Sequence, residues 1–119
     1  MLSIAFCDDE PIMLEELFNV VKGYIDSKKV EFTADLFESG EEFVEKGVRC
    51  RKYDIVFLDI EMKEMNGLEA AAWFRKLNEQ SKVIFVSSHV EYTLDAFKVA
   101  AFRYIIKNKD CLLYTSPSP

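Results

Sequence analysis

The sequence predicts an α/β fold in which a doubly wound parallel sheet carries helices on both faces. Short apolar runs of strand length recur along the chain, as expected of strands that are buried on both faces. Segments with helical periodicity separate them, and this alternation implies right-handed crossovers between parallel strands. Each apolar run also ends in a reactive polar residue: 2–7 in Asp8 and Asp9, 55–58 in Asp59, 83–86 in Ser87 and 102–106 in Lys107.

The intervals between these strands have the patterns of amphipathic helices. From Pro11 to Ile25, apolar residues recur every three or four positions. Residues 39–42 form a capping-box pattern that predicts a short helix ending near Gly47. A further strand is expected over 30–37, and helices over 67–77 and 92–100. In the helix over 67–77, the residues expected to face the sheet are Leu68, Ala71, Ala72 and Leu77.

Length and composition limit the possible classes of protein. A chain of 119 residues forms one domain with a single core, and half of its residues are hydrophobic. No run approaches the roughly 20 apolar residues of a membrane span, and Met1 leads directly into a strand, so we expect neither a signal peptide nor a membrane anchor. The net charge of -6 argues against direct nucleic-acid binding. Cys7, Cys50 and Cys111 have no metal-site spacing, so we expect reduced thiols in the cytoplasm.

The polar residues at the strand ends should meet at one edge of the sheet. Parallel strands point the same way, and ligands bind outside their carboxyl ends. Three carboxylates, a hydroxyl and an ammonium would then share one crevice, which suits a hard cation and a phosphoryl group. The three carboxylates are neutralised only when one Mg²⁺ and the Lys107 ammonium are both present.

Several motifs at these positions occur in order and with fitting spacing over nearly all of residues 1–108. They are Cys7-Asp8-Asp9-Glu10, Leu58-Asp59-Ile60-Glu61-Met62 with Asn66-Gly67, Val86-Ser87-Ser88-His89, and Ala101-Phe102-Arg103-Tyr104-Ile105-Ile106-Lys107. With them the chain resembles the receiver domain of two-component response regulators. The amino-acid sequence at 89–92 and 96–97 is most similar to that of regulators with a LytTR-type DNA-binding module (LytR/AgrA-like). The resemblance implies a flavodoxin-like five-stranded parallel sheet of order 2-1-3-4-5.

The resemblance also implies a chemistry for the crevice. Asp59 would be the phosphoacceptor, taking a phosphoryl group from a sensor histidine kinase with Mg²⁺ as cofactor. Asp9 would bind the metal directly, Asp8 mainly through water, and the backbone carbonyl of Glu61 would complete the protein ligands together with Asp59. Lys107 would neutralise the phosphoryl group. Such a domain is a signalling element, catalysing only its own phosphorylation and dephosphorylation.

The output would follow from the same site. By resemblance, Ser87 moves toward the phosphoryl group and Tyr104 fills the space that this movement opens. His89, two residues after Ser87, would have at most a modulatory role. The expected output is control of transcription through a DNA-binding domain outside this chain, with receiver homodimerisation on phosphorylation as a further expectation.

The chain departs from the family pattern at three places. Lys63-Glu64 stands where receivers usually carry Pro-Gly, which bears on the stiffness of that loop. Asn108 follows Lys107 where a cis-proline is usual, so we expect a trans bond or strain. After a receiver domain over 1–110, residues 111–119 hold two prolines and no amphipathic period, so an irregular, non-native-looking tail should replace the fifth helix. Apolar surface on the fifth strand and first helix should then be under-covered.

Three other classes remain open from the residues alone. A haloacid-dehalogenase-like phosphatase also uses an aspartate after a strand, as Asp59-Ile60-Glu61 superficially offers, but the chain lacks room for a cap domain. A flavin-binding domain of the same topology would need a loop rich in Ser, Thr and Gly to bind the flavin phosphate, and no loop of this sequence is of that kind. A pseudo-receiver would act without phosphorylation, and the complete acidic set argues against it.

Overall fold

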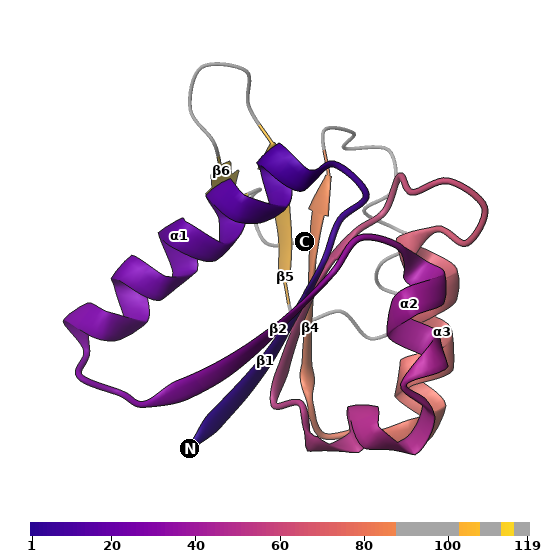
Figure 1. Cartoon of the computed structure of the whole chain (residues 1–119), viewed down its shortest axis with the longest axis horizontal. Helices are drawn as coiled ribbons and strands as arrows, with labels where there is room; N and C mark the ends of the chain where they lie inside the picture. Colours follow the sequence, from indigo (N-terminus) through magenta and orange to yellow (C-terminus); the bar gives the residue numbers. More distant parts are fainter. Residues whose placement is uncertain (88–102, 108–112, 116–119) are drawn as a thin grey trace.

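Six strands form one sheet, of order β2-β1-β3-β4-β5-β6, in a computed structural model that describes residues 1–87, 103–107 and 113–115. Strands β1 to β5 pair in parallel, which confirms the predicted order 2-1-3-4-5. Helices α1, α2 and α3 connect β1 to β4 in turn (Figure 1), with a 3-10 helix, η1, between α2 and β3. The strands are β1 (Leu2–Cys7), β2 (Phe32–Phe37), β3 (Ile55–Asp59), β4 (Lys82–Ser87), β5 (Arg103–Lys107) and β6 (Leu113–Thr115). The helices are α1 (Pro11–Ser27), α2 (Gly40–Glu45), η1 (Gly47–Lys52) and α3 (Gly67–Leu77).

Strand β6 differs from the irregular tail predicted over 111–119 at its three residues, Leu113–Thr115; the other residues of that range lie outside the described part of the chain. Strand β6 pairs antiparallel with β5, and its residue Leu113 lies opposite Lys107. An edge strand presents unpaired backbone groups, so a short extended segment can pair with β5 even where no helix can form. Three predicted features lie outside the described residues: the helix over 92–100, the position of His89, and the bond between Lys107 and Asn108.

The two faces of the sheet carry separate hydrophobic cores. Helix α1 covers one face, and α2 and α3 lie on the other (Figure 1). Side chains alternate along a strand, so Ile4 and Phe6 of β1 join the core under α1 while Ala5 and Cys7 join the core under α2 and α3. Because both faces of these strands are buried, their sequences are continuous runs of apolar residues.

Helix α3 begins where predicted, and three of the four residues expected to face the sheet do so: Ala71 is buried, and Leu68 and Leu77 pack against the core under α2 and α3. Asn66 caps the helix with a complete capping box, in which the side chain of Glu69 accepts from the Asn66 amide. The buried residues are Gly67, Ala70, Ala71 and Phe74. The prediction that Ala72 faces the sheet is wrong, because Ala72 is exposed. An alanine-rich helix gives little contrast between its faces, and the position of Phe74 decides which face is buried.

A wide apolar groove lies on the α1 side of the sheet, where the sequence predicted under-covered surface. Its volume is about 700 Å³. The lining includes Leu17 and Ile25 from α1 together with Phe57, Ile84 and Ile105 from three strands. No helix in the described part of the chain is long and apolar enough to cross a membrane.

Candidate functional site

Three predicted strand ends meet at one edge of the sheet. Leu58 lies opposite both Cys7 of β1 and Phe85 of β4, and Asp59 lies opposite Val86. The residue that follows β1, Asp8, therefore reaches the level of Asp59. Both carboxylates are almost fully buried, with exposures of 1% for Asp8 and 4% for Asp59.

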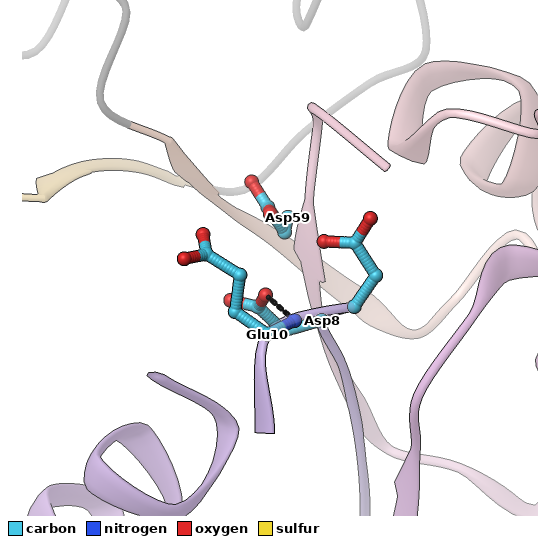
Figure 2. A group of neighbouring side chains, drawn as sticks. Asp8, Glu10 and Asp59 are labelled. Carbon is cyan, nitrogen blue, oxygen red and sulfur yellow. Dashed lines mark hydrogen bonds between the residues drawn. The ribbon is translucent and has the colours of Figure 1, made fainter. Parts of the chain in front are cut away.

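The acidic residues form a compact cluster. One carboxylate oxygen from each of Asp8, Asp9, Glu10 and Asp59 lies within 4.8 Å of the others. Figure 2 shows Asp8 and Glu10 on the segment after β1, next to Asp59 at the end of β3. The Glu10 amide donates to Asp8 Oδ1 at 2.9 Å, which fixes one oxygen of that carboxylate. Sequence reasoning placed Asp8, Asp9 and Asp59 here but missed Glu10, whose adjacency to Asp9 was the available signal.

Ser87 and Lys107 end the neighbouring strands β4 and β5, whereas Tyr104 lies within β5, two residues before the level of Ser87. Ser87 ends β4 and is fully buried. Lys107 ends the backbone of β5, and Tyr104 lies opposite Phe85; the side chains of Lys107 and Tyr104 lie outside what the structure describes. The Glu61 amide donates to Asp59 Oδ1 at 3.3 Å, which ties the following loop to the central carboxylate.

The loop between β3 and α3 is held by two carboxylates. The Lys63 amide donates to Asp9 Oδ2 at 3.1 Å, and the Met65 amide donates to Glu41 Oε2 at 3.1 Å. Hydrogen bonds from the backbone amides of Glu41 itself and Met65 lower the pKa of the Glu41 carboxyl. Glu64 completes the turn with a φ of 61°. Lys63-Glu64 thus makes a defined turn without the usual Pro-Gly, and the role of Glu41 had no signal in the sequence.

A buried thiol lies directly beneath the cluster. Cys7 donates to the Ser39 carbonyl at 3.2 Å and to Met62 Sδ at 3.5 Å. Burial, and then the nearby charge of Asp8, raise the pKa of the Cys7 thiol well above its usual range. Cys50 is also free and buried, and burial raises its pKa to about 11. Both thiols belong to the core under α2 and α3.

The carboxylate oxygens at this edge of the sheet determine which ligands it can bind. Carboxylate oxygens are the ligands that hard divalent cations prefer. Crowded carboxylates repel one another, and a bound cation removes that repulsion. A cavity of about 420 Å³ lies beside the cluster, lined by Asp9, Ile60, Glu61, Met62, Lys63 and Asn66. The site therefore suits a cation bound next to Asp59, with space at its side for a further group.

Comparison with known proteins identifies similar chains. The family model described as the response regulator receiver domain matches residues 4–112. The chain is 31% identical over 103 residues to the transcriptional regulatory protein LytR of Staphylococcus aureus strain N315, covering 84% of this chain and 39% of that protein. It is 35% identical over 112 residues to the sensory transduction protein LytT of Bacillus anthracis, covering 92% of this chain and 43% of that protein. It thus spans about two fifths of the curated relatives it matches.

A solved structure extends the likeness to three dimensions. The response regulator protein TrrA from Thermotoga maritima, solved in complex with Mg(2+)-BeF, is 32% identical to this chain with a TM-score of 0.70. The match covers 92% of this chain and 90% of that one. The similarity therefore extends over almost the whole chain.

Proposed function

The chain belongs to the family of response regulator receiver domains, and on that premise we propose that it accepts a phosphoryl group on Asp59 and switches conformation in response. The observation that carries this proposal is the convergence of Asp8, Asp9 and Asp59 at the end of the central strands. Asp59 ends β3, which lies between β1 and β4, and its carboxylate accepts from the Glu61 amide.

The transfer itself requires a nucleophile and a leaving group in line. An oxygen of the Asp59 carboxylate attacks the phosphorus of a phosphohistidine on a sensor histidine kinase. The P–N bond breaks, the histidine nitrogen leaves, and an aspartyl-phosphate forms. The contribution of the protein is positioning and charge neutralisation, as in phosphoryl transfer generally.

Magnesium fits the donors of this chain. When bound, Mg²⁺ would neutralise negative charge on the phosphoryl oxygens and on the carboxylates. Asp9 and Asp59 would hold it directly, Asp8 mainly through water, and the Glu61 carbonyl would complete the set. Lys107 would supply the second positive charge from β5. The Mg(2+)-BeF complex of TrrA supports this choice of metal.

The switch would use residues at the ends of the neighbouring strands. Ser87 is adjacent to the strand of Asp59 and gains a new acceptor when a phosphoryl oxygen appears there. Its movement would allow Tyr104 on β5 to change position, as a population shift between existing states. His89 would tune the lifetime of the phosphoryl group.

The wider role concerns a longer protein. LytR is named a transcriptional regulatory protein, so we propose that this receiver controls a DNA-binding output domain of LytTR type. The receiver itself would act as a cytoplasmic signalling domain that contacts neither nucleic acid nor membrane. Phosphorylation would drive pairing of two receivers.

A phosphorylation-independent pseudo-receiver is the alternative function. Membership of the receiver family weighs against the other alternative, a haloacid-dehalogenase-like phosphatase.

The test is labelling by a small acyl-phosphate donor with and without Mg²⁺. Wild-type protein should gain acid-stable, base-labile label only with the metal. Asp59→Asn should lose the label because an amide cannot attack phosphorus, whereas the exposed control Asp26→Asn should keep it. Labelling of Asp59→Asn at the wild-type level would show that another residue is the acceptor. An unlabelled wild-type protein would favour the pseudo-receiver.

A further inference from the structure

The first residue of α3 lies against the backbone of Asp59. A Cβ built on Gly67 would overlap the Asp59 carbonyl oxygen and would lie 2.9 Å from the Asp59 carbonyl carbon and from Ile60 Cα. All three are main-chain atoms, so no flexible side chain can move aside to make room. Only a residue without a side chain permits this contact.

The requirement for glycine here is steric and not conformational. Among the described glycines only Gly47 has a positive φ, so the backbone of Gly67 is one that any residue adopts. A Cβ built on Gly23 in α1 has nothing within 4 Å, so an alanine there meets open space. Gly40, at the start of α2, also makes a close approach, but to Met65 and not to the acidic cluster, so Gly67 and Gly23 form the matched pair for a test at Asp59.

Two sets of hydrogen bonds keep α3 in this position. The Gly67 amide donates to the Ile60 carbonyl at 2.9 Å, across the whole β3–α3 loop. The Asn66 side chain accepts from the Glu69 amide at 2.9 Å and fixes the first turn of α3. The start of α3 and the main chain of Asp59 and Ile60 are therefore one rigid junction.

We propose that Gly67 is a positioning residue for the phosphoacceptor. Its missing side chain lets the first turn of α3 hold the main chain of Asp59 at the depth where its carboxylate meets those of Asp8 and Asp9. A side chain at this position pushes the end of β3 away from α3 and carries the Asp59 carboxylate out of the cluster. This inference rests on the proposed function for its consequence in phosphorylation, but its geometric content concerns the cation site alone.

The experiment compares Gly67→Ala with the matched control Gly23→Ala in the full chain. Three quantities are measured: the free energy of unfolding in urea, the affinity for Mg²⁺ alone by calorimetry, and the rate of labelling by acyl phosphate per folded molecule. Gly67→Ala should weaken Mg²⁺ binding by on the order of ten-fold or more, the usual effect of disturbing the groups that orient metal ligands, and should slow labelling to a similar extent. Gly23→Ala should leave both unchanged.

The outcomes separate positioning from mere stability. A purely structural glycine would lower the free energy of unfolding and leave the Mg²⁺ affinity of folded molecules unchanged, and that result would overturn the proposal. If Gly67→Ala does not fold, Asn66→Ala decides, because it loosens the same junction without adding volume. Asn66→Ala should weaken Mg²⁺ binding several-fold, and wild-type affinity in that variant would count against the proposal. If the wild-type protein takes no label, the proposed function fails, while the Mg²⁺ affinities still decide the positioning role.

Discussion

Glu64 turns the β3–α3 loop with a backbone conformation that favours glycine, since its φ is 61°. This left-handed conformation costs an L-residue with a side chain about 1–2 kcal/mol. Glu64→Gly should therefore raise the free energy of unfolding by about 0.5–1 kcal/mol, because the greater freedom of glycine in the unfolded chain offsets part of the relief. Urea unfolding at neutral pH measures the change.

The neighbouring residue provides the control for that substitution. Lys63 is not among the residues with positive φ in the described ranges. Lys63→Gly keeps the main-chain amide that donates to Asp9 and should cost about 0.5–1 kcal/mol, as glycine does where its freedom is not needed. Equal losses in the two variants would mean that the turn stores no strain at Glu64.

The contact between Tyr53 and Asp35 makes a pH-dependent contribution to stability. The Tyr53 hydroxyl donates to Asp35 Oδ2 at 2.6 Å, and this hydrogen bond holds the pKa of the Asp35 carboxyl below its usual value. A carboxyl whose pKa is lower in the folded state stabilises the fold above its unfolded pKa of 3.8, and that stabilisation is lost as pH falls through the folded pKa.

Tyr53→Phe removes this hydrogen bond and keeps the ring in the core. The free energy of unfolding should fall by about 1 kcal/mol near neutrality, below the usual range for a charged acceptor because Asp35 is about half exposed. The difference from wild type should narrow at pH values below 3.8. Urea unfolding at the two pH values tests this, with the exposed Tyr24→Phe as a control that should show no such dependence. A difference that stays constant with pH would contradict the role of Asp35.

At the scale of the element, the two faces of α3 make two of its alanines unequal. Ala70 is fully buried against the sheet, whereas Ala72 is exposed. Ala70→Leu should overpack the core and lower the free energy of unfolding by about 1–3 kcal/mol. Ala72→Leu should change it by no more than about 0.5 kcal/mol. Thermal or urea unfolding of the pair checks this, and the opposite order of effects would support the prediction that Ala72 faces the sheet.

The elements differ in how well the sequence predicted them. Strands β1, β3 and β4 were found because burial on both faces leaves an uninterrupted apolar run that ends at the functional edge. The short strand β6 was missed because its pairing depends on the free edge of β5 and not on its own composition. The clamp on the β3–α3 loop was missed because Asp9 and Glu41 bind main-chain amides, which every residue except proline carries.

At the scale of the whole molecule, the acidic cluster adds local repulsion to a chain whose net charge is already -6. A divalent cation should therefore stabilise the folded state, by about 2.7 kcal/mol when its concentration is 100 times the dissociation constant. The increase in the free energy of unfolding on adding the cation should be smaller in Asp9→Ala than in Asp8→Ala if Asp9 binds the metal directly and Asp8 through water. Mg²⁺ titrations followed by thermal unfolding test this ranking, with Asp26→Ala as an exposed control. Equal losses in Asp8→Ala and Asp9→Ala would remove the distinction.

The apolar groove beside α1 has a calorimetric consequence. Surface that is already hydrated in the folded state adds nothing to the heat capacity change of unfolding, which comes mainly from newly exposed apolar area. A chain of 119 residues ordinarily shows a change of about 1.4–1.8 kcal/mol/K. With a groove of about 700 Å³ whose lining includes the exposed Val20, Tyr24 and Val30, this chain should fall below that range. Its stability curve should then be flatter, so that the free energy of unfolding varies less with temperature than in a domain of equal length with a closed core.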